Sequence, residues 1–365
     1  MGKRHYQIDT RVFAVFFVAA MPFVAFGSFM VVNMARASLE QSLGESFEQR
    51  AVETKLLVER YVGEQIVALH MIGLDPEVGS VLAGASKGPI PARLREMLQV
   101  RPAWTLLQVI DSTGRVVAAS GGAAALLDAE VGWLRRLAQD SSDRQAYVGD
   151  IQTRPGGATP VLALAYPIRQ PDGALLGALR VLVDASDLYG VLAPVRIGRT
   201  GHALVVRSSD GMLLASDESQ RMLREPYAGF PSLSAAIQGF PLAEQGELVF
   251  GKSGGLHGHW SIPEVRNRDD TGREVRIEPA RLVGYAPVDQ VPGVKWTVIV
   301  EQDLAEAVSP IVGVTRYLWI HFIGVFGTVI LLALYFSIKS ESPVIDEQLH
   351  LHEEHVSKGA AAGQA

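Results

Sequence analysis

The sequence predicts an α+β fold: a long N-terminal helix and two tandem antiparallel-sheet modules, flanked by two transmembrane helices. Three observations predict it. Two long apolar runs, residues 12–32 and 318–338, lie near the ends of the 365-residue chain. Apolar residues recur at helical spacing after the first run. The region from residue 76 to residue 306 then repeats one pattern of strands and turns.

Each apolar run is long enough to cross a bilayer, because about 20 residues at ~1.5 Å rise per residue span a hydrocarbon layer of ~30 Å. Lys3, Arg4 and Arg11 precede the first run, and positive charge beside a span is retained in the cytoplasm. The region between the runs is therefore expected outside the cytoplasm. The alternative is a signal peptide cleaved near residues 25–27, but the run is longer than an ordinary signal-peptide core.

The expected order is a cytoplasmic N-terminus (1–11), a first transmembrane helix (12–33), a long extracytoplasmic helix (34–75), a membrane-distal module (76–187), a membrane-proximal module (188–306), a juxtamembrane segment with the second transmembrane helix (307–338), and a short, disordered cytoplasmic tail (339–365). The tail is too short for a kinase or cyclase domain. We therefore expect a separate signalling partner protein, or a chain that only binds.

Charge and cysteine content exclude several function classes. Five Lys/Arg and six Asp/Glu lie outside residues 35–316, which leaves 28 basic and 33 acidic residues in the external region. So balanced a surface argues against nucleic acid as a partner. The chain has no cysteine, which excludes disulfides, thiol nucleophiles and iron–sulfur clusters. The external region must rest on its own apolar core.

The first external element is predicted to be a helix because its apolar residues recur at near-helical spacing. Asp75 and Pro76 mark its end, since the residue before proline is disfavoured in a helix. Its apolar stripe has two interpretations: it packs on its own domain, or it forms the seam of a parallel homodimer. The stripe consists of Leu39, Leu43, Phe47, Ala51, Val58, Val62 and Leu69.

An internal repeat follows. Residues 106–118 form an apolar run, a glycine turn and a second apolar run, and residues 203–214 repeat this pattern. Both segments are predicted to be β-hairpins, because glycine supplies the positive φ of tight turns. A strand, a Pro/Gly turn and another strand at 165–183 recur at 285–300. Two copies of one antiparallel unit are implied.

This order of elements resembles the double Cache family, the extracellular sensor domains of bacterial membrane receptors. The resemblance covers residues 35–306, and its most specific stretch is Tyr147-Val148-Gly149-Asp150 with the later segments 160–167 and 172–179. It implies two PAS-like Cache modules and a two-pass protein of the bacterial inner membrane with its large domain periplasmic or extracellular. It also implies recognition of a small ligand in the distal module.

Many members of this family bind amino acids through an Arg-x-Trp-Tyr element and a late aspartate. Here Trp133 matches the tryptophan and Asp184 the aspartate, whereas Val131 and Leu134 replace the arginine and the tyrosine. The usual carboxylate clamp is therefore absent. The ligand class implied is an amine, an amino acid or an organic acid.

A binding pocket is predicted from aromatic side chains, which supply contact area, and from Asp and Arg, which pair with charged ligand groups. Each residue also has a structural interpretation, as core for the aromatic residues, as a turn cap for Asp150, or as a solvated side chain for Arg169. The predicted ligand-binding residues are Trp133, Tyr147, Asp150, Tyr166, Arg169 and Asp184.

Residues for catalysis or metal binding are hard to find. His257 and His259 would share one face of a strand, but a glycine-rich surface loop is the favoured interpretation. The tail histidines His350, His352 and His355 fit a polar chain end better than a metal site. No nucleophile elbow, P-loop or dinucleotide fingerprint occurs. The sequence thus predicts no enzyme, no cofactor and no metal.

The favoured function is a membrane sensor of a small extracellular molecule. The alternative is a membrane-anchored binding or assembly subunit of a transporter or envelope complex, without signalling. An anchored external hydrolase is a third, weaker hypothesis. A ligand-dependent change in the membrane helices would separate the first two, and turnover of a substrate would reveal the third.

Overall fold

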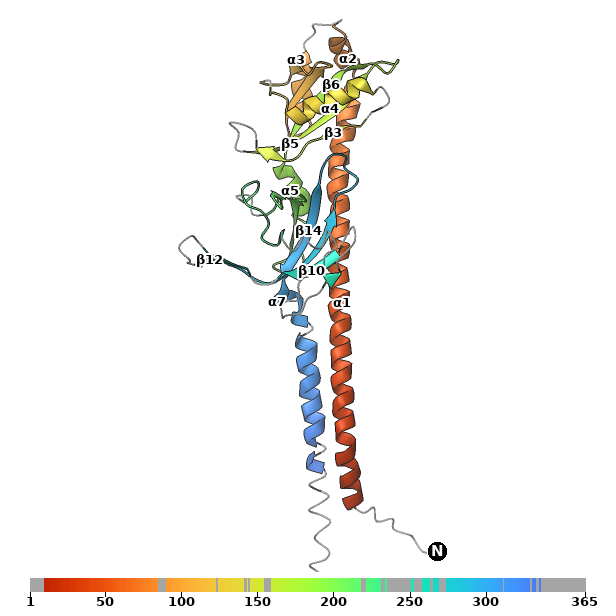
Figure 1. Ribbon diagram of the computed structural model, residues 1–365, viewed down its shortest axis with the longest axis vertical. Helices are drawn as coiled ribbons and strands as arrows, with labels where there is room; N and C mark the ends of the chain where they lie inside the picture. The colour runs from red at the N-terminus through yellow and green to blue at the C-terminus, as the bar shows by residue number, and fades with distance from the viewer. Residues whose placement is uncertain are drawn as a thin grey trace, which may run out of the picture. The chain divides into compact units, whose positions relative to one another are not determined.

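The structure is a computed structural model that describes residues 10–84, 90–122, 124–140, 143, 145–153, 159–217, 221–230, 234, 251–252, 258–262, 265–268, 274–310, 312–328, 330–332 and 335. The chain divides into two compact units. One consists of residues 1–40 with 308–365, and the other of residues 41–307 (Figure 1). The second unit carries both sheets.

Two helices are long and apolar enough to cross a membrane. The first is Pro22–Gly73 within α1 (Thr10–Gly73), and the second is Val312–Leu332. Helix α1 ends where the sequence predicts a break. Asp75 accepts a hydrogen bond from the backbone N–H of Glu77 at 2.9 Å and so caps the next helix, α2 (Pro76–Leu82). A proline at the first helical position is favourable there, because its missing N–H would be unpaired anyway.

The first sheet has the strand order β2-β1-β6-β5-β3, with β4 also paired to β5. Helix α4 (Asp128–Gln139) packs on one face of this sheet through Trp133, Leu134 and Leu137. Helix α3 (Ile90–Gln99) precedes the first strand. The strands are β1 (Trp104–Asp111), β2 (Val116–Ala119), β3 (Tyr147–Val148), β4 (Gln152–Thr153), β5 (Pro160–Arg169) and β6 (Leu175–Asp184).

The second sheet has the strand order β8-β7-β14-β13-β10-β9. Helix α5 (Ser186–Leu192) connects the first sheet to it, and α7 (Leu304–Ala307) follows its last strand. Strands β11 (Val265–Arg268) and β12 (Glu274–Glu278) pair separately. The sheet consists of β7 (His202–Arg207), β8 (Leu213–Ala215), β9 (Gly251–Lys252), β10 (Gly258–Ile262), β13 (Arg281–Pro287) and β14 (Trp296–Asp303).

The predicted repeat and fold class are confirmed. Hairpin β1–β2 turns at Gly114 (φ 91°) and hairpin β7–β8 at Gly211 (φ 73°). The second repeated block is the antiparallel pair β5–β6 in the first sheet and β13–β14 in the second. In each sheet the second strand of this pair, β6 or β14, lies beside the first strand of the hairpin, β1 or β7. Both sheets are therefore built on the same order of strands.

The apolar stripe of α1 packs on its own domain. For the stripe residues that are buried in this way, packing within the chain is the interpretation that holds. Gly284 of β13 lies against the backbone of Phe47 so closely that a side chain there would collide with it. The stripe is shielded from solvent over five of its positions: Phe47, Ala51, Val58, Val62 and Leu69.

The favoured interpretation of the histidine pair, a surface loop, is wrong for His259. This residue lies in β10, is 6% exposed, and its Nδ1 is 3.2 Å from Oε2 of Glu48 on α1. The imidazole is placed against Gly44, where a Cβ would have no space. A buried ring next to a carboxylate explains why a polar residue is tolerated here. His257 and the tail histidines lie outside the described residues.

Candidate functional site

Trp133 and Tyr147 are brought together on the α4 face of the first sheet. Their ring centroids are 5.6 Å apart, and the Nε1–H of Trp133 donates to the backbone oxygen of Gln145 at 3.3 Å. Trp133 is 5% exposed and belongs to the apolar core, whereas Tyr147 is half-buried. Burial raises the pKa of the Tyr147 hydroxyl, so that it stays protonated. Tyr147 alone of the two has surface available to a ligand.

Asp150 joins the two sheets. One oxygen of its carboxylate accepts the indole N–H of Trp296 on β14 at 2.9 Å, and the other pairs with Arg207 on β7. The backbone N–H of Ile151 also donates to it. Trp296 is almost fully buried. The carboxylate thus satisfies a buried donor in the other module, which is a structural task.

The other three predicted residues contact other groups of the protein. Tyr166 stacks on His70 of α1, with ring centroids 4.5 Å apart. Arg169 donates to the carbonyls of Leu137, Asp140 and Asp143 and thereby holds the end of α4. Asp184 accepts the backbone N–H of Ser186 at 2.9 Å, at the start of α5. The structure therefore gives each of these side chains a partner within the protein.

A cavity of about 300 Å³ lies on the α4 side of the first sheet. Tyr147 packs beside it against Ala163 and Leu182, and Asp184 pairs with Val161 across strands β6 and β5. None of the six predicted residues lines it. Its lining is Ala124, Ala125, Leu126, Leu127, Gln152, Thr153, Val161, Ala163, Arg180 and Leu182.

One lining residue, Arg180, forms a buried ion pair with Glu130. Arg180 of β6 donates through Nε to Oε1 of Glu130 at 2.6 Å and through Nη2 to Oε2 at 2.9 Å. Its Nη1 donates to Gln108 at 2.7 Å. The side chains of Arg180 and Glu130 are 3% and 1% exposed. Such a pair is stable only when its hydrogen bonds are satisfied, as they are here.

Sequence reasoning missed Arg180 and Glu130, although a signal was present. Arg180 interrupts the apolar strand Leu-Gly-Ala-Leu-Arg-Val-Leu-Val and lies on the same face as Ala178 and Leu182 by strand alternation. A charged residue in a buried strand requires a partner. Glu130 lies three residues before Trp133 and therefore on the buried face of the same helix.

A second charged cluster lies in the second sheet, around Glu301 of β14. Glu301 is 1% exposed, and it accepts hydrogen bonds from Tyr227 at 2.6 Å and from Arg281. His202 Nε2 is 3.3 Å from Glu301. Burial alone would lower the pKa of His202, but the hydrogen bond and the charge of Glu301 overcome it and raise that pKa to about 9. His202 is therefore a cation at neutral pH.

This pKa predicts a loss of stability in alkali. Because the pKa of His202 is higher in the folded chain than its ordinary value near 6.5, its contribution is complete below about pH 6.5 and lost as the pH rises through about 9. We expect a contribution of roughly 2–3 kcal/mol to the free energy of unfolding. Chemical denaturation between pH 6 and 10 measures it. His202→Gln should flatten the curve in that range, and an unchanged slope in the variant would contradict the assignment.

Helix α7, which follows the last strand of the second sheet, is hydrogen-bonded to the turn that follows α5. The hydroxyl of Thr200 donates to Glu306 of α7 at 2.6 Å, and the backbone N–H groups of Arg199 and Thr200 donate at 2.8 and 3.0 Å. These hydrogen bonds lower the pKa of Glu306 to about 2. Gly198 has a φ of 59° beside this carboxylate. The contact lies directly before the second candidate span in the chain.

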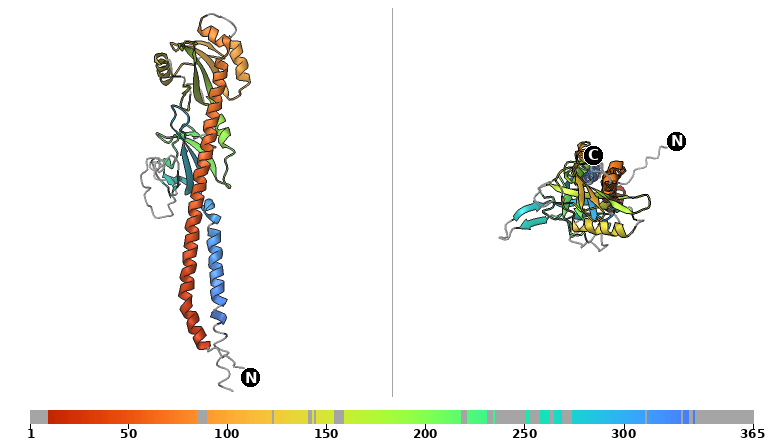
Figure 2. Two further views of the ribbon diagram at one scale, coloured as in Figure 1. Left: turned by 90° about the vertical axis from the view of Figure 1, so that its right-hand side faces the viewer. Right: turned by 90° about the horizontal axis from the view of Figure 1, so that it is seen from above.

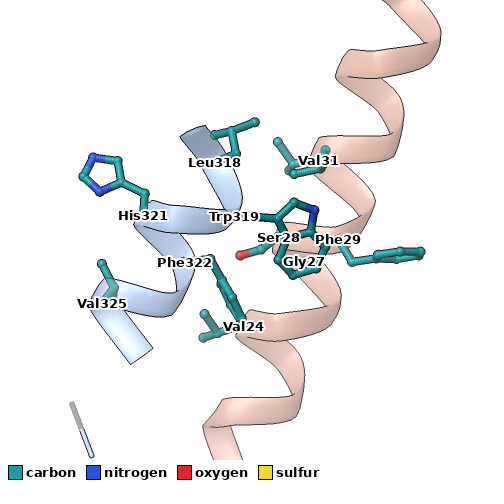
Figure 3. Close-up of a pocket in the computed structure, with 11 residues that line it drawn as sticks. Val24, Gly27, Ser28, Phe29, Val31, Leu318, Trp319, His321, Phe322 and Val325 are labelled. Carbon is teal, nitrogen blue, oxygen red and sulfur yellow. The ribbon is translucent and has the colours of Figure 1, made fainter. Parts of the chain in front are cut away.

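A second hollow, of about 490 Å³, lies between the helices of the smaller unit (Figure 3). Its walls are mainly apolar, with Trp319 and Phe322 extending toward α1 near Ser28 and Val24, whereas His321 points away (Figure 3). Polar groups do not converge there among the residues drawn. Binding of a polar metabolite is better supported in the first sheet.

The chain belongs to the double Cache family. The family model, whose description is Cache domain, matches residues 33–311, which include both sheets and the part of α1 that follows residue 33. Both sheets are therefore part of a Cache domain, and the resemblance noted in the sequence is confirmed. Among curated proteins, no sequence matches this chain.

Several solved structures are similar to the chain. The ligand-binding domain of the Pseudomonas aeruginosa PAO1 amino acid chemoreceptor PctB, in complex with L-Arg, is 14% identical over 73% of this chain and 97% of its own, with a TM-score of 0.45. That of the Pseudomonas fluorescens chemoreceptor CtaA with L-serine is 13% identical over 73% and 98%, also with a TM-score of 0.45. That of Pseudomonas aeruginosa PAO1 PctC with GABA is 17% identical over 71% and 99%, with a TM-score of 0.42.

Proposed function

We propose that the chain is a membrane-anchored sensor that binds a small organic molecule in the cavity of the first sheet. The observation that supports this most strongly is the cavity itself, of about 300 Å³, in a chain of the Cache family. This volume is at the lower end for small-molecule sites, which typically have a mostly apolar lining and a few placed polar groups. The occupant is then a metabolite rather than a peptide.

The lining favours a ligand with a compact apolar body and a polar end. Seven of the ten lining residues are alanine, leucine or valine, and the polar ones are Gln152, Thr153 and Arg180. The positive charge of Arg180 is balanced by Glu130. The site therefore does not require a ligand of one net charge. An amino acid, an amine or an organic acid satisfies these conditions, with Arg180 as the lining group that can face a carboxylate.

Binding rather than turnover fits the lining. The only lining hydroxyl is that of Thr153, and both oxygens of Glu130 already accept hydrogen bonds from Arg180. A nucleophile needs a base within hydrogen-bond reach. We infer from this pairing that the protein does not act as an enzyme at this site.

Contacts in the larger unit support transmission toward the membrane. Strand β6 lines the cavity and continues into α5, and the turn after α5 is hydrogen-bonded to Glu306, directly before Val312–Leu332. A ligand that binds one arrangement of β6 more tightly would shift the equilibrium between the arrangements of this connection. We propose that the two apolar helices lie in a bacterial inner membrane, with the sheets outside, and that a separate protein receives the signal.

Thermal unfolding of the full-length protein in mild detergent tests the proposal. A panel of amines, amino acids and organic acids is added one at a time, and one chemical class is expected to raise the melting temperature. A ligand at 100 times its dissociation constant adds about 2.7 kcal/mol to the free energy of unfolding. Absence of a shift across the whole panel would contradict binding of these classes.

A further inference from the structure

The turn between β13 and β14, residues 288–295, is held from α1 by polar contacts. Figure 2, left, shows α1 passing both sheets of the larger unit. One carboxylate oxygen of Glu59 accepts the backbone N–H groups of Asp289 and Gln290, both at 3.0 Å. Lys55 of the same helix adds an ion pair with Asp289, in which Nζ and Oδ1 are 2.6 Å apart. Glu59 is buried, and a shielded carboxylate with two N–H donors fixes the turn against the helix.

The turn is held from the first sheet as well, at its end where β14 begins. Asp150, which lies between β3 and β4, accepts the indole N–H of Trp296 at 2.9 Å, and Trp296 is the first residue of β14. The other carboxylate oxygen of Asp150 pairs with Arg207 of β7. The two backbones also come close, since a Cβ added to Gly293 would be 3.5 Å from the carbonyl oxygen of Val148. The turn is therefore a place where α1 and the two sheets meet.

The segment that contains Asp150 also forms part of the cavity wall. Both residues of β4 line the cavity, and this strand begins two residues after Asp150. On the other side of Asp150, the backbone N–H of Gly149 donates to the carbonyl oxygen of Ala163 on β5 at 2.8 Å, and Ala163 lines the cavity too. Asp150 thus lies between two positions that belong to the wall or contact it. Because only two soft backbone dihedrals per residue separate these positions, a displacement of the wall is transmitted to Asp150.

We propose that Asp150 couples the cavity wall of the first sheet to the second sheet, and that the β13–β14 turn passes this coupling to α1. The role of Asp150 rests on the proposed function in one respect, because the cavity is taken as the binding site. An energetic coupling between two sites is reciprocal, so a change made at Trp296 alters β4 as much as a change at β4 alters Trp296. Strand β14 continues into α7, shortly before the second candidate span. The contact therefore gives the cavity a route toward the membrane that does not use β6 and α5.

Hydrogen exchange of the full-length protein in mild detergent, measured by mass spectrometry with no small molecule added, tests the coupling. Trp296→Phe removes the indole N–H that Asp150 accepts and keeps an aromatic ring in the core. Peptides that cover β3 and β4 are expected to exchange roughly two- to tenfold faster, which is the fold-change for the loss of one hydrogen bond. The matched control is Tyr227→Phe, which removes a hydrogen bond to Glu301 of the same strand within the second sheet and should leave β3 and β4 unchanged. Hairpin β1–β2 reports any global loss of stability, and its exchange should rise less than that of β3 and β4.

A double-mutant cycle shows whether Asp150 and Trp296 act through one contact. In the Asp150→Ala background, Trp296→Phe should no longer change the exchange of β3 and β4, because the acceptor of the indole N–H is already absent. Asp150→Asn is the milder variant, since its amide oxygen can still accept that N–H. In the Asp150→Asn background, Trp296→Phe should still accelerate the exchange of β3 and β4.

Three results would overturn the role of Asp150. The first is exchange of β3 and β4 that does not respond to Trp296→Phe. The second is an equal rise in the Tyr227→Phe variant or in hairpin β1–β2. The third is additive effects of Asp150→Ala and Trp296→Phe. Because no small molecule is used, failure of this coupling leaves the sensor proposal intact, and failure of the ligand panel would leave the exchange result unchanged.

Discussion

Arg180→Met is expected to lower the free energy of unfolding by about 3–5 kcal/mol, because it leaves the carboxylate of Glu130 buried without its partner. The pair is almost fully shielded, and Gln108 would lose a donor as well. Chemical denaturation with the folded baseline checked by circular dichroism measures the loss. An effect of this size would make Arg180 one of the most sensitive positions of the first sheet.

Two variants control this experiment. Arg180→Met with Glu130→Met should recover most of the loss, since a buried ion pair replaced by apolar residues is often neutral. Recovery is incomplete because Glu130 also accepts the backbone N–H of Leu127 at 2.6 Å. Arg115→Ala removes an exposed pair with Asp111 and should cost less than about 1 kcal/mol. Equal losses for Arg115→Ala and Arg180→Met would contradict the account.

Gly284→Ala is expected to lower the free energy of unfolding by about 3 kcal/mol, at the upper end of the usual cost of overpacking. The new Cβ would meet the backbone of Phe47, which has no rotamer to change. Helix α1 would have to move away from the second sheet. Thermal unfolding measures the loss, and protease accessibility near residue 47 reports the displacement of the helix.

The matched control is Gly132→Ala in α4. A Cβ at this position meets nothing within 4 Å, so the substitution should be neutral or stabilise the helix by up to about 1 kcal/mol. If Gly284→Ala were as harmless as Gly132→Ala, the close approach of α1 to β13 would not exist in solution. If both were damaging, the cause would not be the local contact at Phe47.

The fold could be predicted because its signals are local. Asp75 and Pro76 end α1 through the geometry of their own backbone, and the glycine turns at Gly114 and Gly211 set each hairpin without reference to the rest of the chain. The repetition of the pattern then implied two similar sheets. The apolar stripe of α1 was recognised correctly, but periodicity does not say which surface covers it.

The site could be predicted only in part, because its contacts join residues far apart in sequence. Tyr166 and Arg169 have residue types suited to a pocket, yet one stacks on α1 and the other holds the end of α4. Their partners depend on tertiary packing. Asp150 likewise meets Trp296, 146 positions later. Arg180 was the informative residue, since a charge in an apolar strand points to a buried polar group.

Ligand binding to a cavity-blocked variant tests the central claim most directly. Ala125 lines the cavity and is exposed, so Ala125→Trp should fill the cavity opening without disturbing the core. The control is Ala129→Trp, which adds the same ring at an exposed position of α4 that does not line the cavity. Calorimetric titration of the full-length protein is done with the compound that raises the melting temperature most. The account predicts binding to the wild type and to Ala129→Trp, and loss of binding in Ala125→Trp. Unchanged affinity in Ala125→Trp would contradict it.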